Sequence, residues 1–279
     1  MPRWLYQRPN RVFSYFHVIY IAITAAIIAS FRQNTYGSTE KNCFRVLLTL
    51  GFDKPDTITR AIFIITHTVT SSTPHTITAK DITGIILAGG AGRRMGGIDK
   101  GWVKLNGKAL ISHMLERLVP QVGCIVISAN RQFERYQALG YSVVADNPNS
   151  TDKEFQGPIA GILSALRVIN TPYAVIVPVD APILPTQLVQ KLIEDSQKQH
   201  NKLVLIDDGE RTHPLFGLYH HSLLEDLEQY YQNGNRKLIT WCFQQSPRII
   251  KVPEFKNSLI NVNDNETLEG LALALRNTP

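Results

Sequence analysis

The chain has 279 residues, of which 44% are hydrophobic, as expected for a globular protein of one or two domains. Its formal net charge of +6 comes from the first 80 residues, which hold nine Lys or Arg and three Asp or Glu; the remaining residues are neutral overall. A neutral main region without a basic stripe excludes nucleic acid as the expected partner. Three widely spaced cysteines, with no Cys-x-x-Cys pair, indicate neither a zinc site nor a disulfide framework, so we expect a reducing compartment.

The first 80 residues differ in character from the rest. Residues 12–31 carry no charged side chain, follow three arginines and are long enough to span a bilayer. Residues 32–80 mix Ser, Thr and Asn with short apolar pieces and show no sustained period. Three interpretations stay open: translation through an over-long gene start, a membrane tether, or a targeting peptide that is removed. We predict an extension over residues 1–80 that lies outside the fold, a single domain over residues 81–279, and a cytoplasmic protein without membrane contact.

The stretch 83–104 organises the rest of the chain. An apolar run at residues 85–87 ends in a glycine cluster followed by Arg93, Arg94 and Lys100. Glycine lets the backbone approach a ligand and point N–H groups at phosphate oxygens, while arginine and lysine supply positive charge. The spacing matches neither G-x-x-x-x-G-K-[ST] nor G-x-G-x-x-G. The sequence therefore predicts a buried strand that leads into another kind of phosphate loop; the alternative is a glycine-rich hairpin with solvated cations.

Apolar strands and helices alternate after this loop. Strands are expected at residues 124–128, 142–145, 173–179, 203–206, 212–218 and from 249. Helices are expected at residues 109–119, 133–139, 157–169, from about 185, and at 223–230, 236–243 and 266–275. Such alternation predicts right-handed β-α-β units and a mainly parallel sheet. In these sheets ligands bind beyond the carboxyl ends of the strands.

Three polar residues follow predicted strands at those ends. Asp180 closes the most hydrophobic strand, where a carboxylate can ligate Mg²⁺ together with phosphate oxygens. The alternative role for Asp180 is the N-cap of the helix near Pro185. Ser128 and Asp146 end two other strands, and Asp146 could instead cap a helix.

A second acidic group lies in the turn at residues 207–211. The pair Asp207 and Asp208 could form a second metal site, but we favour a solvated hairpin turn. His213 either faces a substrate or is structural. Asn263 or Asp264 is expected to cap the last helix.

Residues 87–101 read L-A-G-G-x-x-x-R-M-G-G-x-D-K-G, which resembles the signature of the molybdenum cofactor guanylyltransferases. Similar stretches follow at residues 105–108, 128–131, 157–161, 178–180, 209–211 with 213–214, and 261–263. The likeness covers residues 82 to about 275 and nothing earlier. It implies an α/β, three-layer Rossmann-like fold of the glycosyltransferase type, as in nucleotide-diphospho-sugar transferases, with a mainly parallel central sheet.

The resemblance also implies a reaction, in which GMP passes from GTP to the terminal phosphate of molybdenum-molybdopterin and pyrophosphate leaves. It implies Arg94, Lys100 and Asp180 as catalytic residues and Mg²⁺, held by Asp180, as the cofactor. The implied GTP contacts are Leu87, Ala88, Gly89, Gly90, Lys100, Ser128, Asp146 and Asp180. Of these, Ser128 and Asp146 would meet the guanine base, although some family members have asparagine in place of Ser128.

The implied partners are GTP, the molybdopterin acceptor near Asn261 and Asn263, and molybdoenzyme-specific chaperones, with the protein itself a monomer. Family members that use cytidine tend to read L-A-A-G where this chain reads L-A-G-G, which favours guanine. The alternatives are a cytidylyltransferase on the same cofactor, a sugar-phosphate nucleotidyltransferase, and a nucleotide-binding regulatory protein without turnover.

Overall fold

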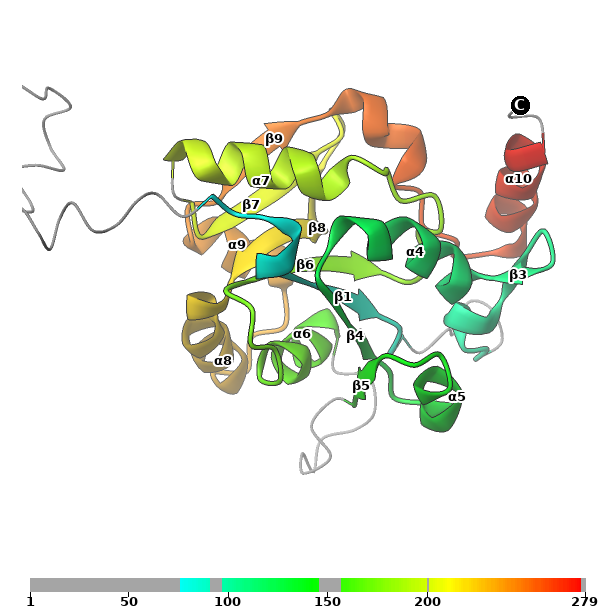
Figure 1. Ribbon diagram of the computed structural model, residues 1–279, viewed down its shortest axis with the longest axis horizontal. Helices are drawn as coiled ribbons and strands as arrows, with labels where there is room; N and C mark the ends of the chain where they lie inside the picture. Colours follow the sequence, from blue (N-terminus) through cyan, green and yellow to red (C-terminus); the bar gives the residue numbers. More distant parts are fainter. Residues whose placement is uncertain (1–75, 91–96, 146–156, 200, 277–279) are drawn as a thin grey trace, which may run out of the picture. The chain divides into compact units, whose positions relative to one another are not determined.

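A computed structural model describes residues 76–90, 97–145, 157–199 and 201–276 of the chain (Figure 1). The strands are β1 (Ile82–Leu87), β2 (Lys104–Leu105), β3 (Lys108–Ala109), β4 (Cys124–Ser128), β5 (Ser142–Val144), β6 (Tyr173–Pro178), β7 (Leu203–Asp207), β8 (Thr212–His220) and β9 (Arg248–Lys251). The α-helices are α4 (Leu110–Leu118), α5 (Phe133–Gln137), α6 (Pro158–Leu166), α7 (Leu188–Gln199), α8 (Leu224–Gln232), α9 (Leu238–Gln244) and α10 (Asn265–Arg276). Short 3-10 helices include η3 (Lys100–Trp102) and η6 (Pro253–Ser258).

The centre of the fold is a seven-stranded sheet with the order β5-β4-β1-β6-β8-β7-β9. Parallel pairs join β1 to β4 and to β6, β4 to β5, and β7 to β9. Strand β8 runs antiparallel to both of its neighbours, β6 and β7. The prediction of a mainly parallel sheet is confirmed, with β8 as the reversed strand.

Helices cover both faces of this sheet, so the α/β three-layer prediction is confirmed. Side chains alternate between the two faces of a strand: on β1, Ile82 and Ile86 pack in one core cluster and Ile85 packs in the other. The first cluster includes side chains of α4 and α7, and the second includes side chains of α6, α8 and α9. Figure 1 shows α4 and α7 above the sheet and α6 and α8 below it.

A small hairpin outside the main sheet was not predicted. Strands β2 and β3 pair antiparallel around Asn106 and Gly107, whose φ angles are 49° and 84°. Two successive positive φ values are the signature of a tight hairpin turn, which Asn-Gly favours. Helix α10 closes over this hairpin, with Leu105, Val262 and Leu271 in a shared buried cluster. The hairpin thereby links the start of the domain to its C-terminal helix.

Other element boundaries differ modestly from expectation. Helix α6 ends at Leu166 rather than at residue 169, and α7 begins at Leu188. Asp264 accepts a hydrogen bond from the Thr267 amide at 2.8 Å, so Asp264 caps α10 and Asn263 does not.

The predicted N-terminal extension lies outside the described residues as far as residue 75. Within the described part of the chain, no helix has the length and apolar character needed to cross a membrane.

Candidate active site

The carboxyl ends of three neighbouring strands meet at one edge of the sheet. Leu87 at the end of β1 lies opposite Ser128 on β4 and Pro178 on β6. The ladder continues one residue further, because the Ala88 amide donates to the Ser128 carbonyl at 2.7 Å and the Val179 amide donates to the Leu87 carbonyl at 3.0 Å. The glycine-rich loop and Asp180 therefore leave the sheet side by side.

At this edge, Lys100 joins two segments that are far apart in the sequence. Its Nζ atom donates to Asp180 Oδ2 at 2.8 Å and to Asn263 Oδ1 at 2.6 Å. The Val262 amide donates to the Asp180 carbonyl at 2.7 Å, which holds the segment before α10 against the end of β6. The side chains of Lys100 and Asp180 are only 16% and 14% exposed. The structure thus brings together Lys100, Asp180 and Asn263, three of the residues singled out in the sequence.

Two oxygen atoms in the same region are buried without a hydrogen-bond partner among the described residues: Asp180 Oδ1 and Asn261 Oδ1. A buried acceptor without a donor is costly, and such atoms often mark a place where a ligand or ion binds. In the described part of the chain there is no cluster of three or more His, Cys, Asp or Glu side chains that could hold a metal. A single carboxylate that shares an ion with phosphate oxygens and water is the arrangement that suits Mg²⁺, so Asp180 fits that role.

Arg131, which follows β4, holds the two described ends of the glycine-rich loop. Its Nη2 atom donates to the Gly90 carbonyl at 2.9 Å, and Nη1 donates to the Gly97 carbonyl at 2.6 Å. Because a guanidinium is a rigid planar fork, one side chain can fix two carbonyl groups at a set separation. The sequence had singled out Arg131 only as part of a family motif, since no spacing rule links it to residues 34 and 41 positions earlier.

The remaining predicted site residues have different surroundings. Leu87 and Gly89 are half-buried, Ala88 is buried and Gly90 is exposed, as expected where a strand gives way to a loop. Ser128 is 1% exposed. Arg94 and Asp146 lie outside the described residues.

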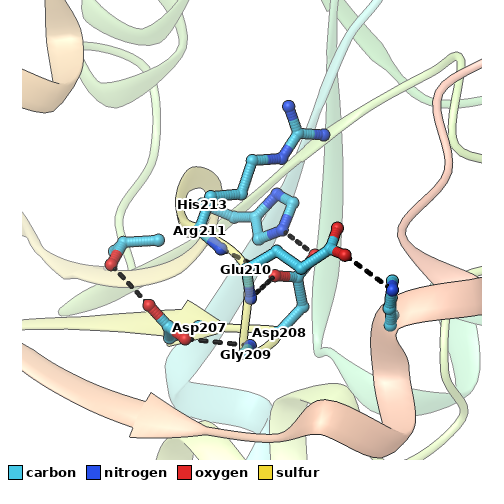
Figure 2. A network of polar contacts seen from close by, with 8 residues as sticks. Asp207, Asp208, Gly209, Glu210, Arg211 and His213 are labelled. Carbon is cyan, nitrogen blue, oxygen red and sulfur yellow. Dashed lines mark hydrogen bonds and ion pairs between the residues drawn. The ribbon is translucent and has the colours of Figure 1, made fainter.

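The turn between β7 and β8 is organised by its own aspartates (Figure 2). Asp207 accepts hydrogen bonds from the Gly209 amide and the Thr212 hydroxyl, each at 2.9 Å. Asp208 accepts from the amides of residues 210 and 211, also at 2.9 Å, and lies 2.7 Å from His213 Nε2. The hairpin-turn interpretation is therefore right, but the turn is not fully solvated: Asp208 and His213 are each 6% exposed.

Replacement of Asp208 by asparagine is expected to destabilise the fold by about 2 kcal/mol near neutral pH, because charge-assisted hydrogen bonds to a buried carboxylate are lost. Burial alone would raise the pKa of Asp208, but the hydrogen bonds from His213 and from the amides of Arg211 and Glu210 outweigh it and hold the pKa well below the usual aspartate value. A depressed folded-state pKa stabilises the fold above the unfolded value of about 4, and this stabilisation is lost as the pH falls further.

Urea unfolding at pH 7 and pH 3 measures the difference in the free energy of unfolding between wild type and Asp208→Asn. This difference should be smaller at pH 3. Glu210→Gln in the same turn is the control, since Glu210 forms a surface ion pair with Lys256 and is 65% exposed. A difference that stays the same at both pH values would contradict the assignment.

Three comparisons with known proteins agree. The family model described as "MobA-like NTP transferase domain" matches residues 84–248. A molybdenum cofactor guanylyltransferase of Shewanella sp. (strain MR-4) is 39% identical over 191 residues, which covers 68% of this chain and 95% of that protein. A protein of the same name from Shewanella baltica (strain OS185) is 36% identical over 197 residues, covering 71% of this chain and 98% of the relative.

Solved structures show the same fold. The crystal structure of molybdopterin-guanine dinucleotide biosynthesis protein A from Archaeoglobus fulgidus has a TM-score of 0.58 at 23% identity and covers 70% of this chain and 98% of its own. A 4-diphosphocytidyl-2C-methyl-D-erythritol synthase from Anaerococcus prevotii has a TM-score of 0.54 at 14% identity, with coverage of 71% and 97%. At these identities the likeness concerns the fold alone.

Proposed function

The chain belongs to the family of MobA-like nucleotidyltransferases, and from that premise we propose that it transfers GMP from GTP to the terminal phosphate of molybdenum-molybdopterin. Pyrophosphate is released, and the product is the molybdopterin guanine dinucleotide form of the cofactor. The observation that carries the proposal is the Lys100–Asp180 pair, set at the carboxyl edge of the sheet beside the glycine-rich loop. The names of the relatives supply the acceptor and the nucleotide.

The chemistry is an in-line displacement at the α-phosphorus of GTP. An oxygen of the acceptor's terminal phosphate forms a new P–O bond, and the bond from the α-phosphorus to the leaving pyrophosphate breaks. The nucleophile is already an anion near neutral pH, so no general base is required. Charge neutralisation and alignment supply most of the barrier reduction in such reactions.

Four groups of residues have assigned roles in this proposal. Amides of the loop that starts at Gly89 and Gly90, with Arg94 and Lys100, bind the triphosphate. Asp180 holds Mg²⁺, which when bound neutralises phosphate charge at the reacting centre. Asn261 and Asn263 contact the acceptor.

Guanine recognition is assigned to the ends of β4 and β5. Asp146 would accept hydrogen bonds from the ring N–H and the amino group of guanine, and Ser128 would add a weaker contact. The partners proposed are GTP, molybdenum-molybdopterin and molybdoenzyme-specific chaperones, and the enzyme is proposed to act in the cytoplasm as a monomer.

The test measures pyrophosphate release by the full chain with Mg²⁺ and molybdenum-molybdopterin, comparing GTP with CTP. We expect kcat/KM to favour GTP by about a hundredfold or more, because a site that hydrogen-bonds one base leaves buried groups unpaired with another. Asp146→Asn should lower the ratio of kcat/KM for GTP to kcat/KM for CTP. Equal use of the two nucleotides would overturn the guanine assignment. Release of pyrophosphate only with a sugar phosphate as acceptor would overturn the assignment of molybdenum-molybdopterin as the acceptor.

A further inference from the structure

The turn that presents Lys100 is anchored by its neighbour Asp99. The carboxylate of Asp99 accepts from the Gly101 amide at 3.1 Å and from the Tyr136 hydroxyl at 2.6 Å. The Trp102 amide closes the turn by donating to the Asp99 carbonyl at 3.1 Å. Asp99 is 4% exposed and Tyr136 is fully buried, so these hydrogen bonds are shielded from water. Lys100 therefore lies between two residues that are fixed by Tyr136. Asp99 is bound by Tyr136 directly, and Gly101 is bound through Asp99.

Tyr136 also determines which residue fits at position 101. A Cβ atom on Gly101 would lie 2.2 Å from the Tyr136 hydroxyl oxygen, while the next nearest atoms, both of the same ring, would lie 3.1 and 3.3 Å away. No real side chain tolerates the first distance, so any larger residue must displace either the tyrosine or the turn. The oxygen of Tyr136 thus holds Asp99 and occupies the space above Gly101.

An outer layer keeps the tyrosine ring in place. The centroids of the Trp102 and Tyr136 rings lie 5.0 Å apart, and the guanidinium carbon of Arg135 lies 3.8 Å from the centroid of the Trp102 ring. Both Arg135 and Tyr136 belong to α5, the helix that follows β4. The helix is therefore packed against the turn by contacts on two successive residues.

We propose that Tyr136 is a positioning residue for Lys100, which it places against Asp180 and Asn263 by bracing the turn at Asp99 and Gly101. This positioning role rests on the proposed function, in which Lys100 binds the triphosphate of GTP. Lysine has a flexible four-carbon stem and a point charge, so its usefulness depends on where its backbone is held. Tyr136 supplies that constraint from α5, the element next to the end of β4.

Removal of one oxygen atom by Tyr136→Phe tests the proposal. We expect kcat/KM for GTP to fall by about ten- to a hundredfold, as misplacement of a positioned group by about 1 Å can do. The matched control is Tyr230→Phe on α8, which removes a hydroxyl that donates to the Lys237 carbonyl at 3.1 Å, and it should leave kcat/KM unchanged. Both donors bond to Asp99 Oδ1, and Asp99→Asn retains an oxygen there, so this variant should lose less activity than Tyr136→Phe.

A double-mutant cycle tests whether position 101 and Tyr136 act through the same contact. Gly101→Ala should lose activity by the clash, and adding Tyr136→Phe should restore part of it, because the oxygen at 2.2 Å is gone and the ring atoms at 3.1 and 3.3 Å can shift slightly. A double variant that is less active than Gly101→Ala alone would overturn the proposal.

The proposed function and the positioning role fail in different ways. If wild type releases no pyrophosphate with any nucleotide, the proposed function fails, and the positioning role is decided by calorimetry with Mg–GTP: the Kd must rise for Tyr136→Phe and not for Tyr230→Phe. If wild type turns over and Tyr136→Phe keeps its kcat/KM, the positioning role is wrong while the function stands.

Discussion

Replacement of Asp180 by asparagine is expected to lower kcat for pyrophosphate release by about a thousandfold or more, while GTP still binds. The side chain keeps its size, but a neutral amide is a poor ligand for Mg²⁺, and without the bound ion the phosphate charge at the reacting centre is not neutralised. Oδ1 of Asp180 is buried without a partner among the described residues, so this atom is available to a ligand in the wild type. Binding should survive because Lys100, freed from its ion pair, remains as a cation for the triphosphate.

Asp195→Asn provides a matched control for this experiment. Asp195 on α7 is also 14% exposed and also pairs with a cation, Arg248, at 2.5 Å. If loss of a shielded carboxylate in an ion pair were enough to harm the enzyme through folding, both variants would lose activity. Normal kcat in Asp180→Asn, or equal losses in the two variants, would contradict the role of Asp180.

The main sheet could be predicted because its signals are local. Strands β1, β4 and β6 are short β-branched runs, and α4 shows apolar side chains at the helical period; such patterns depend only on which face is buried. The rule that ligands bind at the carboxyl edge then predicted that Asp180 lies beside the start of the loop, and the register agrees, since Leu87 and Pro178 lie opposite one another. The reversed direction of β8 had no such signal, because strand polarity is set by the sheet as a whole.

The β2–β3 hairpin was missed for a different reason. Each of its strands has two residues, too few for any period to be visible. The signal that was present is the Asn106-Gly107 pair, which favours a two-residue turn by its tolerance of positive φ.

The contacts within the site depend on long-range packing that the sequence does not encode locally. Lys100 meets Asn263 across 163 positions, and only the family resemblance placed both in one site. For Asp208 and His213, five residues apart, the spacing allowed a contact across the turn, but nothing in it revealed that both would be buried. Tyr136 could not be selected at all, since one buried aromatic residue in a short helix is indistinguishable from ordinary core.

Replacement of Lys100 by methionine is expected to lower kcat/KM for GTP by about 10²- to 10³-fold. The aliphatic stem remains, but the positive charge that Lys100 places against the triphosphate is lost. Lys191→Met is the control: Lys191 pairs with Glu254 at 2.9 Å, is 34% exposed and lies on α7, and its loss should leave kcat/KM unchanged. Unaltered kinetics in Lys100→Met would contradict the triphosphate role.

Stability and catalysis should separate in the double variant Lys100→Met with Asp180→Asn. Lys100→Met alone leaves the Asp180 carboxylate 14% exposed and without its cation, which should cost about 1 kcal/mol or more of the free energy of unfolding. The second substitution removes that charge, so the double variant should unfold at a higher urea concentration than Lys100→Met. Its activity should stay as low as that of the worse single variant, because neutralising an unpaired charge repairs folding but restores neither group that acts on phosphate. Recovery of activity together with stability would instead mean that the pair is structural.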